Sequence, residues 1–156
     1  MRLTTKGRFA VTAMIDLALC EGDYPVTLAS ISERQGISLA YLEQLFGKLR
    51  KRHIVLAVRG PGGGYSLARP SMEISIADII MAVDEPVDAT RCGGKANCHE
   101  GRQCLTHDLW AGLNSAIGNY LSAVSLQNMV ESHLSAGKSV AKVSWRKKVV
   151  QRALSV

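Results

Sequence analysis

The stretch Thr27-Leu-Ala-Ser-Ile-Ser-Glu-Arg-Gln-Gly-Ile-Ser-Leu-Ala-Tyr-Leu-Glu-Gln-Leu-Phe46 decides the fold predicted for this chain. Thr27 can cap a short helix over residues 28–34, because its side chain can accept a hydrogen bond from a backbone N–H of the first turn. Gly36 can adopt the left-handed conformation that commonly ends a helix. Ser38 can cap a longer helix that runs to about residue 51. A short helix, a turn containing glycine and a longer helix form the helix-turn-helix pattern.

The longer helix is expected to have an apolar and a polar face. Large apolar side chains recur at helical spacing and predict the inward face: Leu39, Leu42, Leu45, Phe46 and Leu49. The second helix of a helix-turn-helix lies in the major groove of DNA. A glutamine there can bond adenine at two positions, and a glutamate can accept a hydrogen bond from cytosine N4. We therefore expect DNA contacts from the cap and the outward positions: Ser38, Ala40, Tyr41, Glu43, Gln44 and Lys48.

A β-hairpin is predicted directly after this motif. Two short β-prone runs, residues 55–58 and 65–67, flank the connection Arg59-Gly-Pro-Gly-Gly-Gly64. A hairpin in this place is the wing of a winged helix-turn-helix. The glycine run does not match a phosphate-binding loop, since it lacks the Gly-Lys-Ser/Thr ending and opens no helix. Arg59, with Gly60 beside it, lies at the predicted tip, where an arginine can enter a narrow minor groove.

The charge is distributed unevenly along the chain. Residues 1–70 carry ten basic and five acidic side chains, residues 71–137 carry three and eight, and residues 138–156 carry six and none. A basic, helical front indicates a polyanionic partner. We expect a disordered, solvated tail over 135–156 and assign it no function. The candidate phosphate contacts are basic residues of the front: Arg2, Lys6, Arg8, Arg50, Lys51 and Arg52.

The composition limits the classes of protein. The chain has 156 residues, of which 47% are hydrophobic and only 5% aromatic, which suits a small domain with an aliphatic core. No apolar run is long enough for a membrane span. The run over 9–19 resembles a signal peptide but is interrupted by Asp16, so we expect an amphipathic helix over 8–20 in a cytoplasmic protein with reduced thiols. No nucleophile signature supports an enzyme.

The second half of the chain is predicted to hold a loop and a long helix. Ser75 and Asp78 can cap a helix that runs through residue 83. No periodicity extends over 84–103, which indicates either a long functional loop or a disordered segment. A helix is expected from Cys104, with an apolar stripe formed by Leu105, Leu109, Leu113, Ile117 and Leu121 and widened by Trp110, Tyr120 and Val124. Such a stripe beyond a compact domain predicts a homodimer. The predicted fold is mainly α with a small β-hairpin, divided into a winged helix-turn-helix over 1–83, a loop over 84–107, a dimerisation region over 104–134 and the tail.

The loop carries a candidate metal site. Cys92, Cys98, Cys104 and His107 have the spacing C-x5-C-x5-C-x2-H. Cys104 and His107 are three residues apart at the expected helix start, so their side chains should leave the same face. Thiolates with one imidazole favour zinc or an iron–sulfur centre. Zinc ligands usually come in closer pairs, so the spacing favours a cluster without excluding zinc. His99 is a possible substitute ligand.

Several segments resemble the IscR family of bacterial iron–sulfur cluster regulators over residues 1–130. The resemblance implies a homodimeric winged-helix repressor in which Cys92, Cys98, Cys104 and His107 hold a 2Fe–2S cluster. It further implies a double-stranded DNA operator, repression of cluster-assembly genes while the cluster is bound, and the assembly machinery as cluster donor. The matching segments are Met1-Arg-Leu-Thr-Thr-Lys-Gly-Arg-Phe-Ala-Val-Thr-Ala-Met14, Ile31-Ser-Glu-Arg-Gln-Gly-Ile-Ser38, Tyr41-Leu-Glu-Gln-Leu-Phe46, Val58-Arg-Gly-Pro-Gly-Gly-Gly-Tyr65, Val83-Asp-Glu85, Val87-Asp-Ala-Thr-Arg-Cys92 and Cys104-Leu-Thr-His107.

Two other functions compete with this interpretation. A zinc-stabilised helix-turn-helix adaptor would bind protein partners, but the basic wing favours DNA and the cysteine spacing disfavours zinc. A redox enzyme that uses a cluster would need a substrate site, for which the sequence offers no signature. The colour of anaerobically purified protein discriminates between a cluster and zinc.

Overall fold

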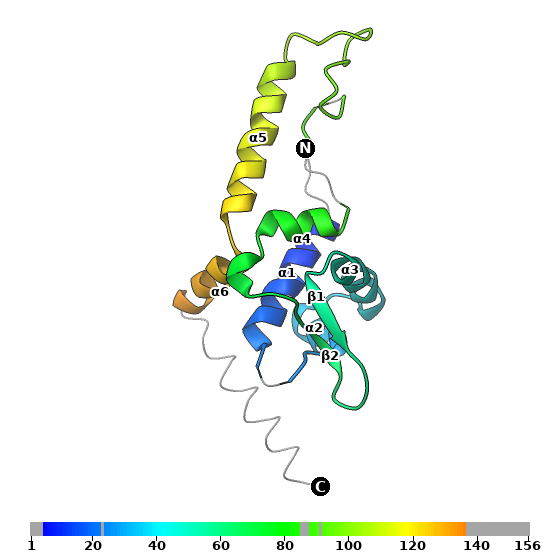
Figure 1. The fold of residues 1–156 in the computed structure, drawn as a ribbon, viewed down its shortest axis with the longest axis vertical. Helices are drawn as coiled ribbons and strands as arrows, with labels where there is room; N and C mark the ends of the chain where they lie inside the picture. The colour runs from blue at the N-terminus through cyan, green and yellow to red at the C-terminus, as the bar shows by residue number, and fades with distance from the viewer. Residues whose placement is uncertain (1–4, 23, 85–87, 91, 137–156) are drawn as a thin grey trace.

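The computed structural model describes residues 5–22, 24–84, 88–90 and 92–136. Arg2 and residues 137–156 of the expected tail lie outside these ranges. No helix in the described part is long and apolar enough to cross a membrane. The elements in chain order are α1 (Thr5–Cys20), α2 (Leu28–Gln35), α3 (Leu39–Lys51), β1 (Val55–Val58), β2 (Gly64–Leu67), a 3-10 turn η1 (Ser71–Glu73), α4 (Ile76–Ala82), α5 (His107–Ala123) and α6 (Leu126–Ser135) (Figure 1).

The helix-turn-helix forms as predicted, because its signals are local. Thr27 Oγ1 accepts a hydrogen bond from the backbone N–H of Ser30 at 3.2 Å and caps α2. Gly36 ends that helix with a φ of 66°, in the left-handed region. Ser38 Oγ accepts from the N–H of Tyr41 at 3.3 Å and caps α3. One position on α3 was predicted wrongly: Leu39 is 42% exposed, because the first turn of the helix projects beyond the core.

The wing is a two-stranded antiparallel hairpin attached to the helix-turn-helix. Val55 pairs with Leu67, and the register continues to Val58 opposite Gly64. An additional bridge joins Tyr65 to Val26, with both backbone hydrogen bonds at 2.8 Å. This bridge fixes strand β2, near the hairpin connection, to the residue that precedes the cap of α2.

Two of the wing glycines are required by close backbone approaches. A Cβ at Gly64 would lie 2.6 Å from the carbonyl oxygen of Val26, and one at Gly63 would lie 2.3 Å from that of Val58. The preceding glycine, Gly62, has a φ of 75°, which a side chain would disfavour. The glycine run therefore shapes the hairpin connection and its attachment to the body.

The core is aliphatic and is organised around α1, which contacts α2, α3, α4 and α6. Its largest fully buried side chains include Phe46, Met14 and Leu17. Asp16 lies on the same helix and is only 4% exposed. Its carboxylate accepts hydrogen bonds from Arg34 at 2.8–3.1 Å and from Gln35 Nε2 at 3.1 Å, so a buried ion pair ties α1 to α2.

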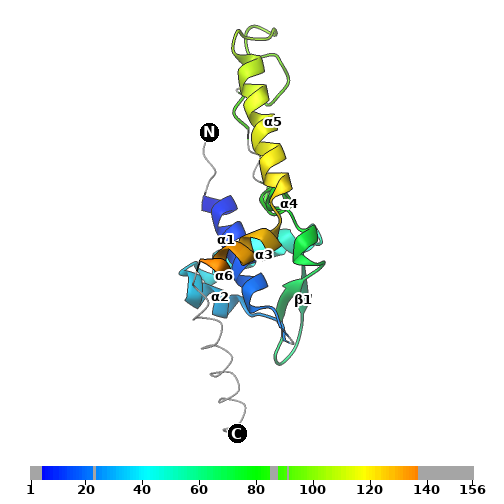
Figure 2. The ribbon, with the colours of Figure 1, turned by 90° about the vertical axis from the view of Figure 1, so that its left-hand side faces the viewer.

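Helix α5 projects away from the body formed by α1–α4, as two perpendicular views show (Figures 1 and 2). Its C-terminal end is attached to the body because Ser125 pairs with Ser75 in an antiparallel bridge. Ser75 also forms the predicted capping box of α4 with Asp78. The expected start of the long helix at Cys104 is wrong, since α5 begins at His107 and residues 104–106 still belong to the loop.

Candidate metal centre and nucleic-acid interface

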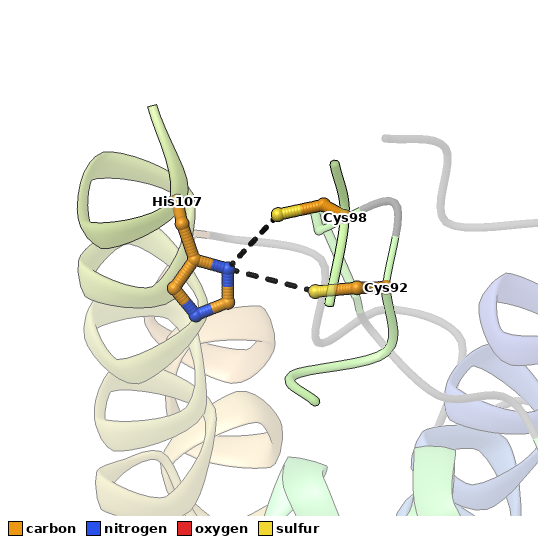
Figure 3. Close-up of side chains that lie close together, drawn as sticks. All are labelled: Cys92, Cys98 and His107. Carbon is orange, nitrogen blue, oxygen red and sulfur yellow. Dashed lines mark hydrogen bonds between the residues drawn. The ribbon is translucent and has the colours of Figure 1, made fainter. Parts of the chain in front are cut away.

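The structure brings together three of the four predicted metal ligands. Cys92 and Cys98 lie on the loop, and His107 is the first residue of α5. The sulfur atoms of Cys92 and Cys98 lie 3.5 and 3.7 Å from His107 Nδ1 (Figure 3). All three ligand atoms lie within 4.8 Å of one another, and His107 is only 8% exposed. Two pieces of chain thus converge on one point at the free end of α5.

Cys104 lies beside this group and is linked to it through its backbone. Its N–H donates a hydrogen bond to Cys98 Sγ at 3.2 Å, while its own sulfur is 3.8 Å from Thr106 Oγ1. Cys104 precedes α5, so the expected shared helical face with His107 does not exist. The two residues are instead connected by a turn, in which the N–H of His107 donates to the carbonyl oxygen of Cys104 at 3.1 Å.

The surroundings of the thiols favour deprotonation at Cys92. Desolvation alone would raise the pKa of Cys92, but hydrogen bonds from the Ala96 backbone, the Thr90 side chain and the Gly94 backbone outweigh it and lower that pKa to about 7. The hydrogen bond between the Cys98 and Cys104 side chains raises the pKa of Cys98 and lowers the pKa of Cys104. Since the thiolate is the form that binds a metal, Cys92 offers a ligand near neutral pH.

The donor set fits a soft metal centre. Two sulfurs and one imidazole nitrogen converge, and such ligands suit zinc or an iron–sulfur cluster better than hard cations. The loop bends tightly around them, with left-handed backbone at Gly93, Gly94 and Gly101. His99 is exposed, and its backbone pairs with Arg102, so this structure does not place it with the three converging ligands.

Sequence reasoning missed a set of side chains that hold the loop against α5. Asp88 and Thr90 lie in the loop and Asn114 lies on α5, joined by hydrogen bonds of 2.7 Å. Asp88 and Thr90 form a local turn in which the side chain of the first residue accepts from the backbone two residues later. The sequence Asp-Ala-Thr is typical of such a turn and could have indicated it. The partner on α5, 26 residues away, left no local signal.

The predicted DNA-contacting residues mostly lie exposed on α3 and the wing. Ala40, Glu43 and Gln44 are exposed on α3, as is its N-cap residue Ser38, and Arg59 and Gly60 are exposed in the hairpin connection. Lys6 lies in the first turn of α1. Tyr41 differs from the expectation: it is half-buried, because its ring packs edge-on against Phe9 with the centroids 5.9 Å apart.

Lys48, the last predicted contact on α3, is engaged by an acidic residue at the end of α4. Its Nζ lies 2.9 Å from Asp84 Oδ2. The hydrogen bond with Lys48 lowers the pKa of Asp84, and the charges of Lys48, Arg52 and Lys6 lower it further. Asp84 has a φ of 55°, a conformation that is uncommon for a residue with a side chain. The junction between α4 and the loop therefore meets the predicted recognition helix.

The fold and these surfaces define a winged-helix DNA-binding regulator. Residues 3–132 match the model of the Rrf2 family, described as iron-dependent transcriptional regulators, and the chain belongs to this family. An HTH-type transcriptional regulator from Neisseria meningitidis is 62% identical over 131 residues, which cover 84% of this chain and 88% of that protein. The regulator IscR of Photorhabdus laumondii is 58% identical over 85% of this chain and 80% of its own.

Solved structures show the same relationship. A structure described as T. potens IscR has a TM-score of 0.72 and 36% sequence identity, and the match covers 87% of this chain and 90% of that one. The relatives are transcriptional regulators rather than enzymes, and this chain is likewise a transcriptional regulator. The predicted mainly α, winged-helix fold is confirmed.

Proposed function

We propose that this protein regulates transcription in response to iron–sulfur supply, through a 2Fe–2S cluster held by Cys92, Cys98, Cys104 and His107. The observation that carries the proposal is the convergence of Cys92, Cys98 and His107 within 4.8 Å, at the end of a helix that stands away from the DNA-binding body. The IscR relatives, which are 57–58% identical, support the choice of cluster over zinc.

Each ligand has a defined task in this proposal. His107 supplies Nδ1 from the first turn of α5, and Cys92 and Cys98 approach it from the loop. Cys104 completes the set from the loop, where its backbone N–H already donates a hydrogen bond to Cys98 Sγ. When bound, the cluster supplies iron-dependent cross-linking between the loop and α5. The loop can therefore take different positions in the loaded and the cluster-free protein.

The DNA-binding surface reads a double-stranded operator in two grooves. Helix α3 enters the major groove with Gln44 and Glu43, and Arg59 of the wing reaches the adjacent minor groove. Ser38, Ala40, Lys48 and Gly60 line the same surface, and the basic residues around it, including Lys6, contact phosphates. These phosphate contacts make affinity fall steeply with salt. The cluster-loaded protein represses the genes of cluster assembly.

A second copy of the chain covers the apolar face of α5. In the single chain this face carries large exposed side chains: Leu109 is 65% exposed and Tyr120 69%, with Trp110 and Leu113 between them. Apolar area of this kind on a projecting helix is typical of a protein–protein interface. A symmetric dimer implies a pseudo-palindromic operator with half-sites about one helical turn apart.

The thiol ligands require a reducing compartment, which places the protein in the cytoplasm. The cluster is delivered by the iron–sulfur assembly machinery.

The proposal is tested with anaerobically purified protein. Visible absorbance, iron and acid-labile sulfide should show one 2Fe–2S cluster per chain, and selection from random-sequence DNA should yield a pseudo-palindrome. His107→Ala should lose the cluster while His99→Ala, the matched control in the same loop, keeps it. A colourless protein that carries zinc would refute cluster sensing and favour the zinc-stabilised adaptor.

A further inference from the structure

The side chain of Asn114 makes a two-point attachment between α5 and the loop. Its Oδ1 accepts a hydrogen bond from the backbone N–H of Ala89 at 2.7 Å, and its Nδ2 donates to Asp88 Oδ1 at 2.7 Å. An amide that is bonded at both ends fixes the direction as well as the position of its partner segment. Asn114 is seven residues after His107, which is two helical turns, so both side chains leave α5 on the same face.

The attachment continues through hydrogen bonds to the neighbourhood of Cys92. Asp88 Oδ1 also accepts from the N–H and the hydroxyl of Thr90, both at 2.7 Å. Thr90 Oγ1 in turn accepts from the N–H of Gly94 at 2.9 Å. Thr90 and Gly94 flank Cys92 on its two sides, so the bonds close the chain around this cysteine. A single carboxylate oxygen thus links Asn114 on α5 to the turn that carries Cys92.

These contacts assign a role to Asn114. We propose that Asn114 is a positioning residue of the cysteine–histidine site, which docks the Cys92 turn on α5 so that the sulfur of Cys92 faces Nδ1 of His107. The role rests on the proposed function, since it takes Cys92 and His107 as ligands. Without the attachment, the loop must order itself around the metal, and the entropy of that ordering weakens binding. Residues that orient ligands typically change metal affinity 10- to 100-fold.

The donor and acceptor pattern allows a test by exchange of the two side chains. Asn114→Asp keeps an acceptor for Ala89 but places a second carboxylate against Asp88, so the attachment should break. Asp88→Asn in the same chain removes the charge repulsion: after a small rotation of the side chain its Nδ2 can donate to the new carboxylate, while its Oδ1 keeps accepting from Thr90. The rescued double variant separates a specific attachment from general damage to α5. Asn119→Ala, an exposed asparagine on the same helix, is the matched control.

Two measurements on the full-length, reduced, metal-free protein decide the outcome. Titration with cobalt(II) alone, followed by its thiolate charge-transfer absorbance, should show binding about 10- to 100-fold weaker for Asn114→Asp and recovery in the double variant. Hydrogen exchange at the Ala89 amide, measured by NMR without metal, should be about tenfold faster or more in the single variant and slow again in the double variant.

Distinct results overturn the inference and the proposed function. If Asn114→Asp binds cobalt within twofold of Asn119→Ala, Asn114 does not position the site. If the unmodified protein gives no cobalt–thiolate absorbance and takes up no iron–sulfur cluster, the ligand site itself is wrong. Should Asn114→Asp fail to fold by circular dichroism, Asp88→Ala breaks the same attachment from the loop, and the same criteria apply to it.

Discussion

Replacing Gly64 by alanine should detach the wing from the helix-turn-helix. The added Cβ would lie 2.6 Å from the carbonyl oxygen of Val26, 2.7 Å from its carbonyl carbon and 3.1 Å from the nitrogen of Thr27. All three are backbone atoms, so no side chain can rotate away. Ordinary contact begins at 3.4 Å, and strand β2 must therefore move by about 0.8 Å or more from Val26.

The magnitude follows from the bonds that this movement breaks. Val26 and Tyr65 exchange two backbone hydrogen bonds of 2.8 Å. A net value of about 1 kcal/mol for each gives a loss of about 2 kcal/mol in the free energy of unfolding. For a chain of this size, that corresponds to a fall of about 4–8 °C in the melting temperature. Operator affinity should fall as well, because Arg59 moves with the wing.

Thermal unfolding and fluorescence anisotropy with a selected operator measure the two effects. Gly22→Ala is the matched control, since a Cβ at Gly22 meets nothing within 4 Å. Its melting temperature and DNA affinity should stay close to those of the unmodified protein. If Gly64→Ala melts within 2 °C of Gly22→Ala, the close approach does not constrain the wing, and the reasoning fails.

Three further perturbations test other contacts. Arg34→Ala should lower the free energy of unfolding by about 3–5 kcal/mol in urea titration, because it leaves the carboxylate of Asp16 buried without its cation; a loss below 1 kcal/mol would contradict this. Lys48→Met should raise the pKa of Asp84 toward its ordinary value, measured by carboxyl NMR. Since the pKa of Asp84 is lowered in the fold, the Lys48 pair is present above about pH 4 and is lost as the pH falls through that lowered pKa; an unchanged titration would show that the pair does not form. Glu43→Ala should widen the range of DNA sites bound in a selection experiment, since the carboxylate repels phosphates unless it meets a donor such as cytosine N4; loss of all binding would make Glu43 an attractive contact instead.

The elements that could be predicted are those whose signals lie close together in the chain. The cap at Thr27, the left-handed turn at Gly36 and the cap at Ser38 each involve contacts within a few residues. The capping box of Ser75 and Asp78 is equally local. Such short-range preferences do not depend on the rest of the fold, so they can be identified in the sequence.

The features that escaped prediction depend on distant parts of the chain. Asp16 interrupts an apolar run, and its partner Arg34 is 18 residues away. The attachment of Asp88 to Asn114 spans 26 residues. Cysteine spacing indicated a metal site but not where α5 begins. The N-terminal limit of a helix depends on tertiary contacts when no capping side chain marks it, and Thr106 makes no capping hydrogen bond here.

The length of α5 limits which changes at the cysteine–histidine site can affect the DNA-binding body of the same chain. Its 17 residues extend about 24 Å from His107 to the end that is bridged to the body. At physiological ionic strength the Debye length is about 8 Å, so a charge at one end of the helix is attenuated roughly twentyfold at the other. Under the proposed function, an electron or a metal gained at His107 is therefore not felt electrostatically along this path. Along this path, a change in the position of the loop can reach the body through the helix, whereas the charge of the site is screened.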